Sequence, residues 1–448
     1  MGTKKLYLSL YPIVLAAIGV AVYWICGGEA KPADTSQSSV TVGRPMEVAP
    51  KAPGSRAQTW ASLAWSAKAN AWLVAWREGC LNESATEIWC ARVNANGETL
   101  DPAGIRIASG TGLRCDVKVA SDGENWLVVW GELGSGKDWD VYGCLVGADG
   151  QPRDKPFLIT GGQDNQCQPA VAFAGDSYYV VWAGFSGSGL PNTPGNGYGL
   201  YGCRVSKQGQ VLESPVELVS NKTYQASHPT VAVAKDKLAV VFKESSQSRW
   251  GGTFLNRVIL DAQTGKIVAG PFPASTRNDR MCGGKVTARW LPIAAVGETF
   301  LTLSRDVEGF GGRNPYAPTF WTLSSGGNLT KSPLTVDALM TPRPYYRPGY
   351  VALASDGRRF LYVSESPRVR KQADPMQPMQ MCIVGWLIAG DGSQLLAGAS
   401  KGGFPIAVEP GREHILPAVC AGPPNTFLVV NSELRGINDL KLVARIVK

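Results

Sequence analysis

The chain has 448 residues, with 52 Gly, 30 Pro, 44% hydrophobic and only 18% charged residues, and a net charge of +8. Charged residues fall below the about 25% of an average soluble domain, which argues against coiled coils and charge-driven disorder, while the abundant Gly and Pro argue against a helix-rich fold. The composition favours a turn-rich β protein, and β-propellers of this length occur as a single unit.

The first predicted element is an N-terminal hydrophobic helix. Lys4 and Lys5 precede residues 6–25, which contain no charge. About 20 apolar residues suffice to span a bilayer, whereas the core of a cleaved signal peptide is usually shorter. We therefore expect an uncleaved anchor over residues 1–30, with the lysines in the cytoplasm and the rest of the chain exported.

Two alternatives for the N-terminal segment stay open. Gly28 and Ala30 are small residues at the spacing of a cleavage site, so the segment also fits a removable signal peptide. Lipidation at Cys26 is less favoured, because Ile25 stands where a lipoprotein signal has a small residue. The polar residues 31–43 predict a flexible tether, and residues 44–448 remain for one folded domain.

An internal repeat dominates the rest of the chain. Its clearest copy comprises residues 169–182, 200–205 and 215–219. Each of these runs has the character of one or more β-strands, and Gln208-Gly209 forms a turn between the last two. Other copies begin near residues 117, 229, 285, 351 and 417, and an earlier copy is recognised at residues 72–76 and 88–93, which makes seven in all.

Each unit holds apolar runs of strand length separated by Asp-Gly, Asn-Gly or Gly-Gly turns, which favour tight hairpins. Seven such units predict an all-β, seven-bladed β-propeller, with six or eight blades as less favoured alternatives because the fifth and sixth units are irregular. The last copy ends after its third strand at residues 440–447, and residues 44–50 match the pattern of a fourth strand. We expect this N-terminal strand to pair with the last blade, which closes the ring and leaves no open sheet edge there.

Residues 140–146 (DVYGCLV) and 200–205 (LYGCRV) resemble the D-[IV]-Y-G-x-R-V repeats of exported bacterial β-propeller proteins. The similarity extends over residues 44–448 and is strongest in the first three blades. It implies a propeller in an exported protein. Those repeat proteins share no common activity that the resemblance implies for this chain.

Propeller topology places the connections between blades, and those between strands two and three, on one face. The long connections 184–199, 305–318 and 364–380 all belong to this face, where binding residues usually lie on a rigid scaffold. The residues just before each first strand should form a polar ring at the axial mouth. The ring residues, and candidate ligand-binding residues, are Asp116, Gln168, His228, Arg347 and His414.

In an exported protein the cysteines after Cys26 predict disulfides. The repeat suggests the pairs Cys115–Cys144 and Cys167–Cys203, with Cys80–Cys90 closing a loop. An alternative pairs Cys90 with Cys115 and Cys144 with Cys167. Cys282 and Cys382 are candidates for a pair between blades, and Cys420 is expected to be a buried free thiol.

The sequence offers little for catalysis. Only two histidines are present, neither in a nucleophile motif, and there is no C-x-x-C pair, so no metal site and no cofactor are expected. Glu132, Asp138 and Asp140 cluster in one loop. They suit a carboxylate pair of a glycosidase, a weak calcium site or, most simply, the cap of a hairpin.

The charge is uneven. Residues 274–372 contain 14 Lys or Arg against seven Asp or Glu, whereas residues 101–210 contain eight against 11. Arg368, Arg370 and Lys371 are the densest basic point and a second candidate binding region. A basic side attracts anionic polymers, while the aromatic residues belong to strand interiors, so no nucleic-acid partner is expected.

Together these features predict a non-enzymatic binding or scaffold protein of the cell envelope. The domain is expected to be monomeric, held at the exported side of the membrane by its N-terminal helix, and secreted if that helix is cleaved. Its loop-rich face would recognise an anionic surface polymer or another envelope protein. The alternative is a glycan-cleaving hydrolase or lyase with its site at the axial mouth.

Overall fold

A computed structural model describes most of the chain beyond residue 38. The described residues are 39–52, 57–80, 83–134, 138–162, 164–185, 198–220, 224–246, 253–272, 280–282, 291–305, 318–336, 350–367, 380–400, 402–436 and 439–448. They form one compact unit, Ser39–Lys448, and contain strands and turns without a helix. The predicted N-terminal helix lies outside them.

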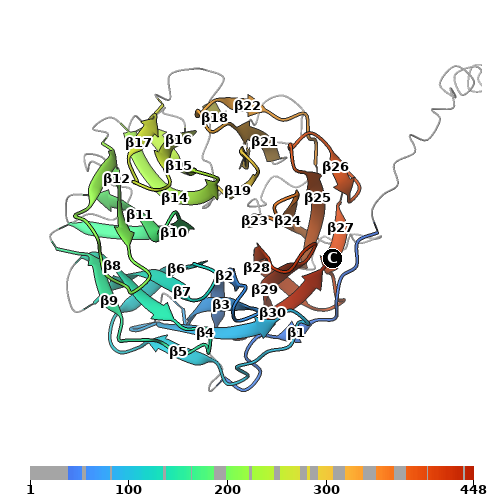
Figure 1. The fold of residues 1–448 in the computed structure, drawn as a ribbon. Helices are drawn as coiled ribbons and strands as arrows, with labels where there is room; N and C mark the ends of the chain where they lie inside the picture. The colour runs from blue at the N-terminus through green and yellow to red at the C-terminus, as the bar shows by residue number, and fades with distance from the viewer. Residues whose placement is uncertain are drawn as a thin grey trace, which may run out of the picture. The chain divides into compact units, whose positions relative to one another are not determined.

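Seven antiparallel sheets form a ring, with the first strand of each sheet nearest the centre (Figure 1). This confirms the seven-bladed β-propeller. The strands of the first three blades are β2 Gln58–Ser66, β3 Ala71–Glu78, β4 Glu87–Asn94 and β5 Ile105–Ala108; β6 Leu113–Ser121, β7 Trp126–Leu133, β8 Trp139–Val146 and β9 Phe157–Thr160; and β10 Asn165–Ala174, β11 Ser177–Phe185, β12 Tyr198–Val205 and β13 Val216–Val219.

Blades four and six each carry an additional strand on their third strand, β18 on β16 and β27 on β25. The strands of the fourth and fifth blades are β14 Tyr224–Ala234, β15 Lys237–Ser246, β16 Thr253–Asp261, β17 Ile267–Ala269 and β18 Arg280–Cys282; and β19 Ile293–Val296, β20 Thr299–Arg305, β21 Pro318–Leu323 and β22 Leu329–Lys331. Those of the sixth and seventh are β23 Val351–Ser355, β24 Arg359–Pro367, β25 Met381–Ala389, β26 Leu395–Ala397 and β27 Phe404–Ala407; and β28 Glu413–Ala421, β29 Phe427–Gly436, β30 Asp439–Val447 and β1 Met46–Glu47.

The first strand of blade five differs from the sequence-based expectation. Residues 285–288 were the predicted strand, and they lie outside the described residues. The observed first strand is β19, whose Ile293 pairs with Thr302 of β20. The apolar run 291–296 serves as this strand because a two-residue turn, Gly297-Glu298, leads directly into β20.

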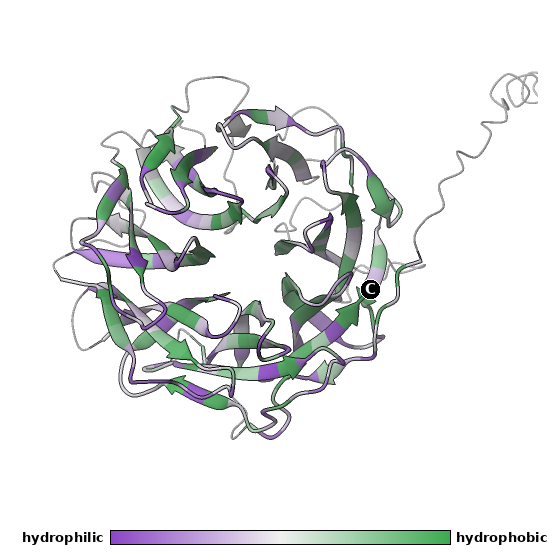
Figure 2. Ribbon diagram, viewed as in Figure 1, coloured by the Kyte–Doolittle hydropathy of each residue, from purple (hydrophilic) through white to green (hydrophobic). Residues whose placement is uncertain are grey.

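The second strands form the most buried layer of the blades, and hydrophobic residues predominate along them (Figure 2). Aromatic side chains on these strands also link neighbouring blades. Trp126 Nε1 donates to Ala64 O of the preceding blade at 2.9 Å, and Trp72 Nε1 donates to Ala421 O of blade seven at 2.9 Å. A buried indole needs a partner for its N–H group. These two bonds therefore fix blade two against blade one and blade one against blade seven.

The N-terminal segment lies along the last strand. Met46 pairs with Ala444, and Glu47 with Val443. Backbone bonds continue upstream, since Thr41 N donates to Lys448 O at 2.9 Å and Lys448 N donates to Thr41 O at 3.0 Å. The segment expected to be a tether therefore already contacts the propeller at residue 41. In the part of the chain that is described, no helix has the length and apolarity needed to cross a membrane.

Candidate functional site at the propeller axis

The first strands of five blades share a β-bulge near their beginning. The register shifts at the same point in β2, β6, β10, β14 and β28. One residue of each bulge has a positive φ: Trp60 (59°), Asp116 (55°), Gln168 (56°), His228 (53°) and Leu416 (56°). Such angles are uncommon for bulky residues, and a bulge re-aims the side chain it carries. The repeated bulge therefore defines one structural position in each of these blades.

Side chains of the preceding blade bind the backbone of two of these bulges. Gln168 Oε1 accepts the His228 N–H at 2.8 Å, and Gln168 Nε2 lies 3.3 Å from His228 Nε2. Glu365 accepts the N–H of Leu416 and, at 2.9 Å, that of Tyr350. A bulge withdraws backbone groups from the ladder, and buried groups of this kind need another partner. Gln168 and Glu365 thus have structural roles at the mouth.

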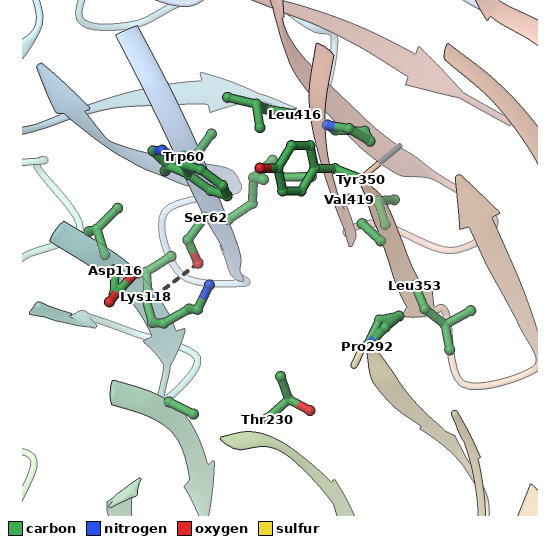
Figure 3. A pocket seen from close by; sticks show the side chains of 18 of the residues that line it. Trp60, Ser62, Asp116, Lys118, Thr230, Pro292, Tyr350, Leu353, Leu416 and Val419 are labelled. Atoms are coloured by element: carbon green, nitrogen blue, oxygen red, sulfur yellow. Dashed lines mark hydrogen bonds between the residues drawn. The ribbon is translucent and has the colours of Figure 1, made fainter. Parts of the chain in front are cut away.

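A cavity of about 290 Å³ lies on the axis and is lined by the first strands of all seven blades (Figure 3). Most of the residues that line it have apolar side chains, while polar atoms make up nearly half of its exposed surface. Every blade contributes a branched aliphatic residue at the same position of its first strand: Leu63, Val119, Val171, Val231, Ile293, Leu353 and Val419. A concave, mainly apolar cavity with a few polar groups is the usual form of a small-ligand site.

Two aromatic residues stand together at one side of this cavity. The rings of Trp60 and Tyr350 are 5.0 Å apart and meet edge to face, with an interplanar angle of 89°. Both are half-buried and both line the cavity (Figure 3). Ser62 lies below them, where its Oγ accepts the Val119 N–H of the next blade at 3.1 Å. The aromatic pair offers an apolar surface with a polar rim.

Lys118 and Asp116 are the charged residues among the described residues that line the cavity. Burial is the main influence on the ammonium group and lowers the pKa of Lys118, while the nearby Asp116 opposes that shift. Asp116 also accepts a contact from Cys115 Sγ at 3.4 Å. The cavity therefore holds one basic and one acidic side chain, whose opposite charges balance one another.

The predicted mouth residues are only partly brought together. Asp116 lines the cavity, and Gln168 and His228 occupy equivalent bulge positions of the next two blades. His414 was placed in this ring, and that placement is wrong: its side chain is 0% exposed and pairs with neighbouring strands. The blade-seven residue at the ring is Leu416, two positions later.

The other predicted binding residues are Arg347, Arg368, Arg370 and Lys371, which lie outside the described residues. The sequence analysis missed Trp60, Tyr350 and Lys118. A signal was available for the ring, because the bulge residue precedes a proline in three blades, at Pro169, Pro229 and Pro417. Aligning these prolines selects Leu416 rather than His414. The same alignment makes Lys118 of blade two equivalent to Ala170 of blade three and Thr230 of blade four.

The predicted disulfides are absent. Among the cysteines whose side chains the structure describes, none is in a disulfide: Cys80, Cys90, Cys115, Cys144, Cys167, Cys203, Cys382 and Cys420. The side chain of Cys282 lies outside the described part. Cys115 lies on β6 and Cys144 on β8, with β7 between them, and the same arrangement separates Cys167 from Cys203. A disulfide needs Cα atoms within about 7 Å, which strands on opposite sides of a third do not offer. The prediction of a free Cys420 is confirmed, although its side chain is half-buried rather than buried.

Two carboxylates of the predicted cluster Glu132, Asp138 and Asp140 make contacts within blade two. Glu132 is engaged by Arg114, whose Nη2 lies 2.7 Å from Oε1 and whose Nε lies 3.0 Å from Oε2. Asp140 accepts the Gly162 N–H at 3.3 Å, and burial raises its pKa. Within the described ranges, no group of three His, Cys, Asp or Glu side chains is placed to bind a metal ion.

Comparison with known proteins supports the fold alone. No family model matches the chain, and no curated protein matches it. A protein of unknown function from Dyadobacter fermentans is similar in structure, with a TM-score of 0.52 and 10% identity over 92% of this chain and 99% of that one. The parainfluenza virus 5 hemagglutinin-neuraminidase ectodomain has a TM-score of 0.47 and 8% identity over 99% of this chain and 96% of its own. The Trypanosoma rangeli sialidase bound to the inhibitor DANA gives 0.45 and 10%, over 87% of this chain and 55% of that one.

Proposed function

We propose that this protein is a non-enzymatic binding protein of the cell envelope, and that its axial cavity binds a sugar unit of a surface polymer. The observation that supports this most directly is the cavity of about 290 Å³ with the Trp60–Tyr350 pair at its side. Sugar rings present C–H faces that pack on aromatic rings and hydroxyl groups that need hydrogen-bond partners. A wall that combines apolar side chains with exposed polar groups suits both needs.

A glycan-cleaving hydrolase is the second candidate, and the geometry favours it less. Most glycosidases use two carboxyl groups, about 5–9.5 Å apart, on either side of the scissile bond. Asp116 is the only carboxylate among the described residues that line the cavity. Glu365 lies nearby, but its two oxygens accept backbone N–H groups of Tyr350 and Leu416. A carboxylate held in this way is poorly suited to exchange protons with a substrate.

The test is a glycan array followed by titration of the purified full-length chain with the best ligand. Trp60→Ala and Tyr350→Ala should each weaken binding at least tenfold, which corresponds to about 1.4 kcal/mol. Tyr142→Ala is the matched control, because Tyr142 is a half-exposed tyrosine on the third strand of blade two. Thermal midpoints are measured in parallel to separate binding from folding. Turnover of a glycan that Asp116→Ala abolishes would instead establish the hydrolase.

We further propose that the chain is exported and held at the membrane by residues 1–30. Lys4, Lys5 and the uncharged stretch 6–25 support this orientation. Membrane fractionation and N-terminal sequencing of the mature protein test it. A mature chain beginning at residue 31 would establish cleavage and secretion, and recovery in the cytoplasm would contradict export.

The last part of the proposal is that the N-terminal strand closes the ring. Pairing of Met46 and Glu47 with β30 supports this, as does the burial of Val48 against the last blade. Such closure removes the free edge that β30 would otherwise present.

A further inference from the structure

The residues at the mouth of the axial cavity differ from one side to the other. Blades six, seven and one are consecutive in the ring, and they contribute Tyr350, Leu416 and Trp60 to the lining (Figure 1). The rings of Tyr350 and Trp60 meet 5.0 Å apart, although blade seven separates their blades. Blade two, which follows blade one, contributes Asp116 and Lys118 (Figure 3). A large, mainly apolar surface therefore lies beside two side chains of opposite charge.

The two charged side chains interact with one another and with the space inside the cavity. Burial lowers the pKa of Lys118, and the carboxylate of Asp116 opposes that shift, so the two charges lie close enough to influence each other. Both side chains are only half-buried and both line the cavity, so part of each residue is accessible from its interior. A carboxylate has about four acceptor positions and an ammonium group has three donors. Partners within the protein and a bound ligand can therefore share these groups.

A ligand with a net charge would upset this balance. A carboxylate on the ligand would be attracted by Lys118 and repelled by Asp116, and an ammonium group on the ligand would meet the reverse. Either charge would also lose hydration on entering the cavity. A hydroxyl group differs, because it can donate to a carboxylate and accept from an ammonium group. The two side chains therefore favour a neutral ligand that carries hydroxyl groups.

We propose that the axial cavity selects a neutral pyranose unit and that Asp116 is the residue that recognises its hydroxyl groups. This inference rests on the proposed function and specifies its ligand. The C–H face of the sugar ring packs on Trp60 and Tyr350, while two adjacent hydroxyl groups donate to the Asp116 carboxylate and Lys118 donates to one of their oxygens. Hydrogen bonds to an ionised group are about twice as strong as neutral ones. The cavity, about 290 Å³, lies at the small end of ligand pockets, which suits a single sugar ring.

The first experiment is calorimetric titration of the full-length chain with matched disaccharides that end in glucose, galactose or mannose. Each is used in three forms, in which C6 of the terminal sugar carries a hydroxyl, a carboxylate or an amino group. The neutral form of the best-binding sugar should bind at least about tenfold more tightly than either charged form, because a charge that faces a like charge opposes binding.

Charge-removing variants test the two residues directly. Asp116→Asn leaves the charge of Lys118 unbalanced and should shift the preference to the carboxylate form, whereas Lys118→Met should shift it to the amino form. The double variant restores the balance and should again prefer the neutral form, with lower affinity. Asp149→Asn and Lys155→Met are the matched controls, because both residues are exposed in blade two and neither lines the cavity. Neither control should change the order of the three forms.

A second measurement tests the hydroxyl contacts on the wild-type chain. Monodeoxy forms of the best-binding neutral disaccharide are titrated in turn. Loss of either of two adjacent hydroxyl groups should weaken binding at least about tenfold, because a site built to bond a hydroxyl rejects an analogue that lacks it. Asp116→Asn should reduce both penalties, and Asp149→Asn should leave them unchanged.

The outcomes separate this inference from the proposed function. Tighter binding of a carboxylate or amino form by the wild-type chain would overturn the neutral ligand and leave sugar binding intact. An unchanged preference in Asp116→Asn and Lys118→Met would overturn the roles of these two residues. Binding of none of the disaccharides would remove the proposed function, and this inference with it. Thermal midpoints are measured for every variant. If a variant fails to fold, equal affinities for all monodeoxy forms in the wild type would still contradict the inference.

Discussion

At the scale of single residues, the arginine of the repeat motif joins neighbouring blades. Arg92 forms a two-pronged bond with Asp101 at 2.9 Å and donates to Ala148 O in the 147–150 turn of the next blade. Arg204 repeats this with Glu213 and with Gln263 O of blade four. Blade two has Leu145 at this position, and its side chain lies against Gly209 of blade three. The motif position therefore contacts the next blade in all three cases, by an ionic or an apolar side chain.

We expect Arg92→Ala to destabilise the domain by about 2 kcal/mol, because it leaves the mostly buried Asp101 without its partner. Chemical denaturation measures the effect. Arg106→Ala is the control in the same blade: Arg106 is 56% exposed and lies 3.6 Å from Glu87, so its loss should cost no more than about 0.5 kcal/mol. Equal effects of the two substitutions would contradict a stabilising role of the Arg92–Asp101 pair.

His414 illustrates how a buried histidine couples the fold to pH. Its Nδ1 lies 3.0 Å from Asn431 Nδ2, and its Nε2 lies 2.9 Å from Oε2 of Glu409. Burial is the main influence and lowers the pKa of His414 from 6.5; Arg445 adds to the shift, while Glu409 and Glu433 oppose it. The folded chain thus holds His414 neutral at a pH where the unfolded chain already binds a proton.

Stability should therefore fall as the pH decreases from about 6.5 toward the lowered pKa, because the unfolded state binds more protons over that window. The measurement is the free energy of unfolding between about pH 7 and 5. His414→Gln should flatten its slope, whereas His228→Gln, at the half-exposed mouth position, should change it less. At still lower pH the protonation of Glu409 and Glu433, whose pKa values are lowered, adds a further loss. An unchanged slope in His414→Gln would contradict this account.

The cysteines were predicted to form disulfides because the protein was expected to be exported, and this argument ignored where the cysteines lie in the sheets. Spacing along the chain cannot show that a strand separates Cys115 from Cys144. Burial raises the pKa of Cys144 and Cys203 to about 12, so both are protonated at neutral pH. A protonated, buried thiol behaves as a small apolar side chain and reacts slowly.

At the scale of elements, the hairpin turns and strand alternation were readable from the sequence, whereas the bulges were not. Each bulge adds one residue to a first strand and shifts the facing of the side chains before it. His414 was placed at the mouth although it lies slightly upstream of the position directly before Pro417, and that position is Leu416. The first strand of blade five was also predicted at the wrong residues. The first strand of blade five has only four residues, which gives little periodic signal.

The N-terminal strand offers the sharpest test at this scale. Deleting residues 44–50 should destabilise the whole domain, because it exposes the edge of β30 and removes Val48 from the buried core. Deleting residues 31–38, which lie outside the compact unit, should leave the thermal midpoint within about 1 °C of the wild type. Equal midpoints for the two truncations would contradict closure by this strand.

At the scale of the whole molecule, the repeat in the sequence was enough to predict the number of blades. Similar apolar runs recur in each unit, and each needs a neighbouring blade to bury it. The site was less predictable, because it is made from one position of every blade. Lys118 does not stand out in the sequence of its own strand. It stands out only when it is compared with the residues at the equivalent position of other first strands, such as Ala170 and Thr230.

Charge distribution leads to the last prediction. The excess of basic residues in 274–372 is densest at Arg368, Arg370 and Lys371, in the connection between β24 and β25. If this side attracts an anionic polymer, replacing all three by Ser should lower the salt concentration at which the protein leaves an immobilised polyuronate. It should also flatten the salt dependence, because exposed charges are screened over about 8 Å at physiological ionic strength.

The control for this triple variant changes the same amount of charge elsewhere. Lys68, Lys155 and Lys266 are exposed and lie in the first, second and fourth blades. Replacing them by Ser should alter elution less than replacing the basic triplet, and neither variant should change stability by more than about 0.5 kcal/mol per substitution. Equal shifts would mean that retention follows net charge alone.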